Sequence, residues 1–201
     1  MSYIGSKPAN KPVVASDLDP TVITGQTALA TSPASTDEFL ISDAGVLKRL
    51  DASLIGGDNT PAFFAYKTSS TQSISSGAIT KVTFDTELYD TDSDFASSRF
   101  TPTTAGKYFV SASILCQANA ETVRYVNMFI RKNGSTNFAT FSPENPDNNF
   151  NGAGVSASVT YDMNGSSDYI EVFAQIQGTS PYVAYSNNGS STYFQGFKLI
   201  T

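Results

Sequence analysis

The sequence predicts an all-β protein, and three observations lead to that prediction. Charged residues make up only 15% of the 201 residues, whereas 14 phenylalanines and 10 tyrosines are present. Apolar and polar residues alternate along Tyr125–Ile130 and Tyr169–Ile176, which is typical of antiparallel strands with one buried face. No stretch keeps the 3.6-residue period of an amphipathic helix. The remaining composition, rich in Ser, Thr, Asn and Gly, favours short strands joined by tight turns.

The first 57 residues predict an extended arm rather than a domain. Asp37–Ser42 and Val46–Leu50 are β-prone, and Asp43-Ala44-Gly45 between them predicts a hairpin turn. The rest of the arm is polar, contains few aromatic residues and is interrupted by four prolines, so it cannot build a sizeable core. A two-stranded hairpin is marginally stable in water, so we expect it to pack on a partner.

The second part of the chain, residues 61–201, is predicted to be a β-rich head. Gly56–Pro61 contains two glycines and a proline and marks the boundary. Strands are expected over residues 62–67, 79–84, 107–117, 124–132, 137–141, 153–162, 168–175 and 192–200, with shorter pieces near Leu88 and Arg99. Such a series of short strands is typical of a sandwich or a barrel.

Three Asn-Gly-Ser triplets, which begin at Asn133, Asn164 and Asn188, predict turns. Asn-Gly favours positive φ at both central residues of a type I′ turn, and the first two triplets lie between expected strands. Each triplet also matches a glycosylation acceptor, which is the alternative interpretation.

The composition argues against catalysis and against nucleic-acid binding, so we expect no enzyme. The chain has no histidine, which removes the commonest general base and the commonest transition-metal ligand. Its single cysteine, Cys116, is expected to be a small buried hydrophobe. The formal net charge is −6, and no basic stripe is present to neutralise a phosphate backbone. No cofactor is expected, and no apolar run is long enough for membrane insertion.

Two groups of carboxylates in the sequence are candidate sites. Asp90, Asp92 and Asp94 alternate as in a calcium loop, but Phe95 and Thr101 stand where an EF-hand has Gly and Glu, so a solvated loop is the expectation and calcium the alternative. Asp85 and Glu87 are close enough in sequence to suggest a glycosidase pair. Carboxylates in turns are ordinary, so we expect no catalytic residues and no metal ligands.

One stretch of the head resembles a known family. Phe95–Ala112, with Phe100, Thr101-Pro102 and Gly106-Lys107-Tyr108-Phe109, resembles the signature of C1q-like and tumour-necrosis-factor-like (TNF-like) jelly rolls. Pro61–Tyr66 and Thr192–Ile200 resemble the opening and closing strands of that family, in the same order. The resemblance covers residues 61–200 and leaves the arm outside it.

The resemblance implies an antiparallel jelly-roll sandwich that associates as a threefold homotrimer. In this family, aromatic and aliphatic residues are buried along the threefold axis. The expected axial contacts in this chain are Phe63, Tyr66, Phe109, Tyr193 and Phe197.

The arm resembles a second group of proteins. Met1–Pro8 and Asp37–Leu50 are similar to the openings of structural proteins from marine and cyanobacterial bacteriophages. This resemblance implies a virion protein made in the host cytoplasm without a signal peptide: a trimeric tail fibre, spike or capsid decoration protein. The arm would dock on capsid or tail proteins through Phe39, Ile41, Val46 and Leu47.

The alternative function is recognition of a host surface glycan or protein through exposed loops of the head. Tyrosines are able to stack on sugar rings, and asparagine amides are able to hydrogen-bond to sugar hydroxyls. The candidate residues in these loops are Asn145, Asn148, Tyr182, Tyr185 and Asn187.

Overall fold

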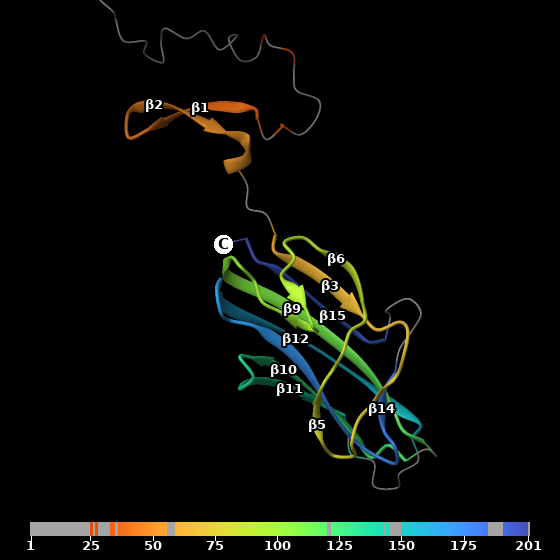
Figure 1. The fold of residues 1–201 in the computed structure, drawn as a ribbon. Helices are drawn as coiled ribbons and strands as arrows, with labels where there is room; N and C mark the ends of the chain where they lie inside the picture. Colours follow the sequence, from red (N-terminus) through yellow and green to blue (C-terminus); the bar gives the residue numbers. More distant parts are fainter. Residues whose placement is uncertain are drawn as a thin grey trace, which may run out of the picture. The chain divides into compact units, whose positions relative to one another are not determined.

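We describe the protein from a computed structural model (Figure 1). The described residues are 25, 27, 33–34, 36–55, 59–119, 122–142, 144, 150–184 and 191–200. The chain separates into two compact units, residues 1–56 and residues 57–201, and each is described by itself. Among the described residues, no helix is long and apolar enough to cross a membrane.

The first unit contains a β-hairpin of strands β1 (Glu38–Asp43) and β2 (Val46–Asp51), which pair antiparallel. Ala44 and Gly45 have φ values of 50° and 83°, so the turn has the two positive φ angles of a type I′ turn. The predicted hairpin is therefore confirmed. A short 3-10 helix, Ala52–Leu54, follows β2 directly.

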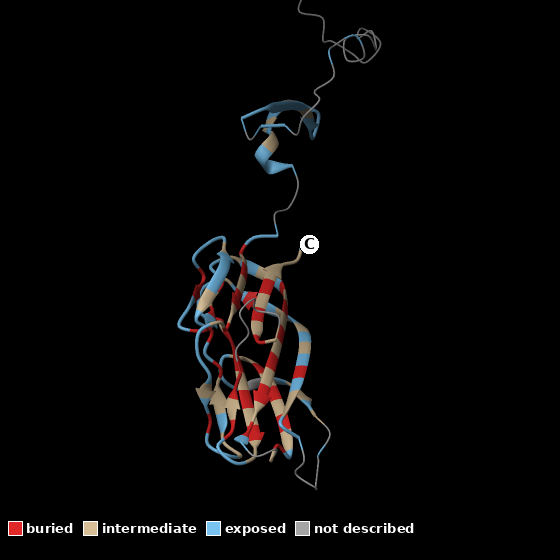
Figure 2. Cartoon of the chain, turned by 90° about the vertical axis from the view of Figure 1, so that its right-hand side faces the viewer, coloured by how far each residue is buried: buried red, intermediate tan, exposed pale blue. Residues whose placement is uncertain are grey.

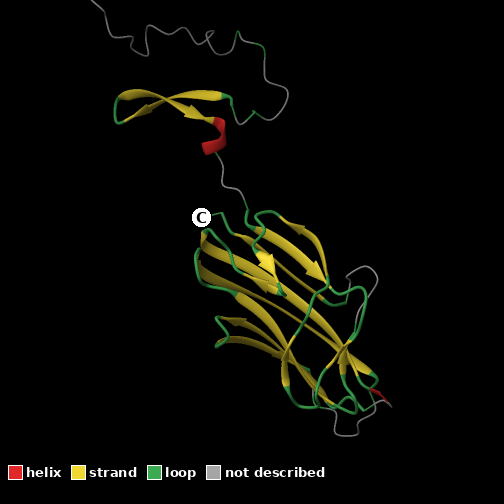
Figure 3. Cartoon of the chain, in the orientation of Figure 1, coloured by secondary structure: helices red, strands yellow, loops and turns green. Residues whose placement is uncertain are grey.

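The second unit, the head, consists of two β-sheets (Figure 3). We call the larger one the β9 sheet. Its strand order is β4 (Gln72–Ser73), β14 (Tyr182–Val183), β9 (Ala105–Gln117), β15 (Tyr193–Lys198), β3 (Ala62–Tyr66) and β6 (Thr86–Asp90). A further strand, β12 (Gly152–Asn164), pairs with the other edge of β9. In the β13 sheet the order is β11 (Thr136–Phe141), β10 (Tyr125–Lys132), β13 (Ile170–Gln177), β8 (Arg99–Phe100) and β7 (Phe95–Ala96), and β5 (Ile79–Lys81) also pairs with β13. All of these pairings are antiparallel, so the expected sheet type is confirmed.

The hydrophobic core of the head is built from side chains that alternate along the strands. In β9, five residues at every second position are fully buried: Tyr108, Val110, Ala112, Ile114 and Cys116. The ring of Phe63 lies 4.3 Å from that of Phe100 and 5.0 Å from that of Phe95, so β3 of one sheet packs on β7 and β8 of the other. Figure 2 shows this pattern, with buried positions along the strands of the head.

Most of the predicted strands are present, with their ends shifted by a few residues. The expected run 79–84 is shorter, because β5 ends at Lys81. Three two-residue strands were not predicted, namely β4, β7 and β14. Strands this short contain too little alternation to be seen in the sequence, and they form only through their partners.

The two described Asn-Gly-Ser triplets both form turns, but only one is the type expected. Asn133 and Gly134 have φ values of 53° and 72°, which confirms a type I′ geometry. At the second triplet only Gly165 has a positive φ, of 69°, so the type I′ prediction is wrong there. Instead, the side-chain oxygen of Asn164 accepts hydrogen bonds from the N–H groups of Ser166, Ser167 and Asp168. The triplet at Asn188 lies outside the described residues.

Candidate assembly face

The outer face of the β9 sheet carries a group of aromatic side chains. Side chains alternate between the two faces of a strand, so the neighbours of core residues in β3, β9 and β15 point away from the core. The half-buried or exposed rings on this side of the sheet come from β3, β6, β9 and β15; they are Phe64, Tyr66, Tyr89, Phe109, Tyr193 and Phe197. We call this group the aromatic face.

The rings of the aromatic face contact one another across adjacent strands. Phe64 in β3 is stacked on Tyr193 in β15, with ring centroids 5.6 Å apart and planes 15° apart. Tyr66 and Tyr89 lie 5.8 Å and 6.3 Å from the ring of Phe64. Aromatic pairs at such distances contribute about 0.5–1.5 kcal/mol beyond their area burial. These contacts therefore hold the exposed rings in fixed positions on the surface.

A second contact extends the aromatic face toward the centre of the sheet. Phe109 in β9 and Phe197 in β15 are directly paired in the strand register, and their ring centroids are 5.5 Å apart. Gln195 and Ser111, also paired, separate these two rings from the stack of Phe64 and Tyr193. The aromatic face thus crosses β6, β3, β15 and β9, which are consecutive in the sheet.

The structure corrects one of the predicted axial contacts. Phe63 is fully buried between the sheets and cannot reach a neighbouring subunit. Its neighbour Phe64 lies on the outer face instead, because one step along a strand moves a side chain to the other face. Tyr66, Phe109, Tyr193 and Phe197 do lie on the outer face, and their contact with another subunit remains a prediction.

Sequence reasoning missed Phe64 and Tyr89. The sequence does not separate Phe64 from Phe63, because an aromatic ring and an alanine stand on each face of β3. For Tyr89 there was no usable signal, since the run around Leu88 has no clear alternation and its pairing with Phe64 depends on a register shift in β3.

A separate apolar surface lies at the open edge of the sandwich, between β11 and β12. Phe141 is 62% exposed and Phe150 is 50% exposed. Both border a cavity of about 330 Å³ whose walls also include Tyr125, Ala153 and Val155. We call Phe141, Phe150 and this cavity the edge surface.

The other predicted site residues are distributed over both units. In the hairpin, Phe39 and Val46 are exposed and Ile41 is half-buried, while the side chain of Leu47 lies outside the described part. The register places Phe39, Ile41 and Val46 on one face of the hairpin. Of the proposed receptor residues, Tyr182 is half-buried in β14, and the other four lie outside the described residues; these are Asn145, Asn148, Tyr185 and Asn187.

The carboxylates considered in the sequence hold loops of the head. Asp90 accepts hydrogen bonds from the backbone N–H groups of Asp94 and Phe95, and Asp94 accepts one from the N–H of Thr103. Among the described residues, no group of three or more acidic or cysteine side chains is arranged to hold a metal ion. Asp85 accepts hydrogen bonds from Thr68 and Ser69, and these outweigh the opposing effect of burial and lower its pKa to about 2. An acid of this pKa is a poor proton donor near neutral pH, unlike the raised general acid of a glycosidase.

Cys116 is confirmed as a buried hydrophobe. It lies in β9 with no exposed surface, and burial raises the pKa of its thiol. A thiol that is held protonated is a weak nucleophile.

No family model matches the sequence, and no curated protein matches it either. Solved structures do match the head in fold. The crystal structure of murine APRIL at pH 8.0 superposes with a TM-score of 0.51 and 12% identity, over 69% of this chain and 98% of that chain. The structure of Eiger TNF from S. frugiperda gives a TM-score of 0.51 and 10% identity, over 69% of this chain and 92% of that chain. The head therefore has a TNF-like jelly-roll fold.

Proposed function

We propose that this protein is a non-enzymatic structural module that assembles through its head into a homotrimer. The aromatic face carries the proposal, because six rings lie together on the outside of a sheet whose inner side already forms a complete core. Contiguous apolar patches of this kind on soluble proteins mark interaction sites.

The position of a second apolar surface supports a ring rather than a twofold dimer. In the β9 sheet the order β6, β3, β15, β9, β12 places the aromatic face toward one side and the edge surface beside β12 at the other. An interface between two different surfaces is heterologous, and it forms a closed ring when the rotation between subunits allows closure. We therefore propose that the edge surface of one subunit packs on the aromatic face of the next. Closure at three subunits follows from the C1q-like and TNF-like resemblance.

The available apolar area is sufficient for association. Five of the six rings are half-buried and only Tyr89 is exposed, so at about 25 cal/mol per Å² covering the remaining surface of one ring contributes about 1 kcal/mol. Six such rings supply a gross gain of about 6 kcal/mol, within the range of about 4–15 kcal/mol for the loss of translational and rotational freedom. The Phe141 and Phe150 rings on the opposing surface add to this gain.

Sedimentation equilibrium of the full chain and of two variants tests the proposal. The wild type should sediment as three times the 21.4 kDa chain. Phe64→Thr with Tyr193→Thr should shift the equilibrium to monomers, since both positions are outward in strands and tolerate threonine. Ile79→Thr is the control, because Ile79 is exposed on the other sheet. A wild-type monomer at micromolar concentration would exclude the assembly.

The finer proposal is that the trimer is a bacteriophage virion protein, a fibre, spike or decoration protein docked by its arm. Its support is the sequence resemblance of the arm and the hairpin face that carries Phe39, Ile41 and Val46. Replacing these three residues with serine should lower the copy number of the protein on purified particles while the head stays folded. A copy number equal to that of the wild type would place docking elsewhere.

A further inference from the structure

The β13 sheet carries a group of charged side chains on the face away from the core. Glu171 in β13 alternates with the core residues Ile170 and Val172, so it belongs to the outer face, yet it is only 4% exposed. Two cations cover it: Nζ of Lys81 and Nε of Arg99 each donate to Oε1 of Glu171 at 2.8 Å. These hydrogen bonds outweigh the opposing effect of burial and lower the pKa of Glu171, so it stays ionised.

A third cation lies beside this pair. Arg131 in β10 is the strand-register partner of Glu171. Its guanidinium lies over the rings of Phe173 and Phe129, 4.5 Å and 5.3 Å from their centroids. Stacking on aromatic rings holds a guanidinium in place without neutralising its charge.

The charge balance of this group differs from that of the other described cations. Six of those have a carboxylate oxygen within 4.0 Å, and each has a carboxylate to itself; they are Lys48, Arg49, Lys67, Lys107, Arg124 and Lys132. Lys81 and Arg99 share the single carboxylate of Glu171, and Arg131 adds a third positive charge beside them. The group therefore keeps a local positive charge on a chain whose formal net charge is −6.

A polar cavity of about 530 Å³ opens beside two of these cations. Lys81 and Arg99 border it together with the hydroxyl-bearing residues Ser97, Thr101 and Thr103. Asp94 also borders the cavity, but its carboxylate accepts hydrogen bonds from the N–H and the hydroxyl of Thr103. The walls thus combine positive charge with groups that both donate and accept hydrogen bonds.

Arg99 is suited to hold an anion in this cavity. Its guanidinium lies over the ring of Tyr169 at 4.0 Å, and it binds Glu171 through Nε. This arrangement leaves the two terminal nitrogens of the guanidinium for an anion. Their forked geometry matches a carboxylate. Lys81 also borders the cavity, and its side chain is 31% exposed, so it is able to bind the same anion.

We propose that this cavity binds the carboxylate of an acidic saccharide, with the sugar hydroxyls bound by Ser97, Thr101 and Thr103. The hydroxyl-rich walls favour a sugar over an acidic peptide, whose side chains would gain little from them. The site lies on the sheet opposite the aromatic face and does not depend on the proposed trimer.

Titration calorimetry of the full chain with four polymers tests the site. The probes are polygalacturonate, which carries carboxylates on sugars; dextran sulfate, which carries sulfates; neutral dextran; and polyglutamate, which carries carboxylates without sugars. We expect saturable binding of polygalacturonate and none of dextran. Arg99→Gln should weaken polygalacturonate binding about tenfold, as expected for losing one charge-assisted bidentate contact. Arg49→Gln is the matched control, because Arg49 is an exposed arginine of the hairpin, and it should leave polygalacturonate binding unchanged.

A second variant keeps the test decisive, and three further outcomes decide against the proposal. If Arg99→Gln fails to fold, Arg99→Lys keeps the ion pair with Glu171 and should still weaken binding, because lysine lacks the fork. Binding of polyglutamate with the same affinity as polygalacturonate would show that the ligand is an acidic peptide rather than a saccharide. Tighter binding of dextran sulfate that is insensitive to both Arg99 variants would show nonspecific attraction. Absence of polygalacturonate binding at millimolar sugar concentration would exclude the site.

Discussion

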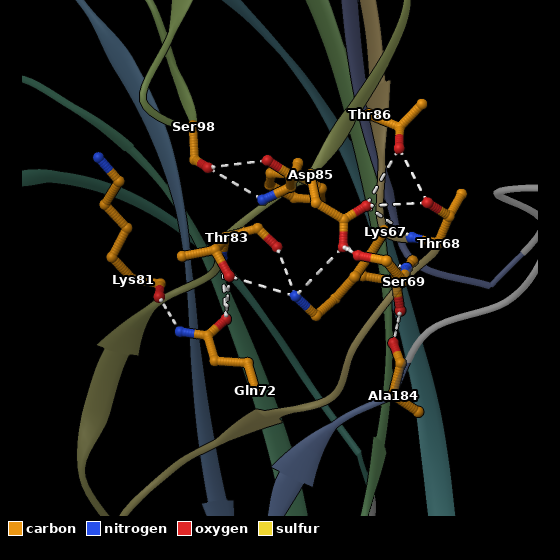
Figure 4. A network of polar contacts seen from close by, with 12 residues as sticks. Lys67, Thr68, Ser69, Gln72, Lys81, Thr83, Asp85, Thr86, Ser98 and Ala184 are labelled. Atoms are coloured by element: carbon orange, nitrogen blue, oxygen red, sulfur yellow. Dashed lines mark hydrogen bonds and ion pairs between the residues drawn. The ribbon is translucent and has the colours of Figure 1, made fainter.

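Lys67 is the most deeply buried cation among the described residues, and it holds together the loops that follow β3 and precede β6 (Figure 4). Its Nζ donates to the carbonyl oxygen and the hydroxyl of Thr83 at 3.2 Å and lies 4.0 Å from Asp85. Burial lowers the pKa of Lys67, and the charge of Asp85 partly offsets that effect. Asp85 in turn accepts hydrogen bonds from the backbone N–H groups of Thr68 and Ser69.

Replacing Asp85 with alanine should destabilise the head by about 2–3 kcal/mol, because it leaves a buried ammonium without its counter-charge and two N–H groups without their acceptor. Lys67→Met should cost less, since it removes the buried charge and keeps the apolar stem, while Asp85 retains its other donors. Urea unfolding measures the free energy of unfolding of both variants. A larger loss of stability for Lys67→Met than for Asp85→Ala would contradict this account of the network.

The acid stability of the head should depend on Asp85 and Asp168. Both carboxyls have a pKa lowered from 3.8 to about 2, Asp168 mainly through hydrogen bonds from Lys132 and Asn133. A carboxyl with a depressed folded-state pKa stabilises the fold fully above its unfolded pKa and loses that contribution as pH falls toward the folded value. Unfolding free energy should therefore drop between about pH 4 and pH 2. Asp85→Asn with Asp168→Asn should show a flatter profile in that window.

The sequence predicts which face of a strand many residues of the head occupy, but it does not separate adjacent residues of the same type. Cys116 is interpreted correctly because it stands in an alternating run with only one possible facing. In Ala62–Tyr66 aromatic residues occur on both faces of the strand, so hydrophobicity alone does not decide which of Phe63 and Phe64 is buried. The burial of Lys67 was not predicted either, since its partners, Thr83 and Asp85, are far along the chain.

Strand β15 depends on a glycine where it crosses the core. A Cβ at Gly196 would lie 2.8 Å from Cγ1 of Val110 and 3.0 Å from the ring of Phe63. The backbone of β15 therefore approaches Val110 and Phe63 closely at this residue. Both obstacles are fully buried, so neither is free to move aside.

Gly196→Ala should destabilise the head by about 1–3 kcal/mol, the usual cost of overpacking a dense core. Gly154→Ala is the matched control, because the same added atom in β12 would meet only the carbonyl oxygen of Ile114, at 3.8 Å. That control should leave stability unchanged or slightly higher, since alanine restricts the unfolded chain. Thermal unfolding of both variants measures the difference, and equal melting temperatures would show that β15 is able to shift.

At the level of elements, long alternating runs are predicted well and short pieces poorly. β9, β10 and β13 follow from their period of two, because one face of each packs on the core. β4, β7 and β14 are stabilised by distant partners rather than by local sequence. The cavity beside Lys81 and Arg99 was not predicted for the same reason, because Lys81, Arg99 and Glu171 meet only after three strands have paired.

At the level of the whole molecule, the hydrophobic core formed by the described residues lies in the head. Every residue of the buried cluster lies between Phe63 and Phe194. In the hairpin, by contrast, the described side chains are exposed or half-buried, with Phe39, Leu40 and Val46 among the exposed apolar ones. Among the described residues, removing the arm therefore takes no side chain from the buried cluster, and the hairpin has too little buried area to fold independently.

A chain that begins at Asn59 should accordingly fold and assemble like the full protein. Its melting temperature should stay within about 2 °C of the full-length value, because 1 kcal/mol would already shift a domain of this size by about 2–8 °C. Its sedimentation should match that of the full chain after correction for mass, since the aromatic face and the edge surface are both retained.

What the shortened chain should lose is the attachment to a virion particle that we propose for the hairpin. A shortened chain that melts more than 5 °C lower would show that the arm packs on the head, and one found on virions at full copy number would move docking to the head.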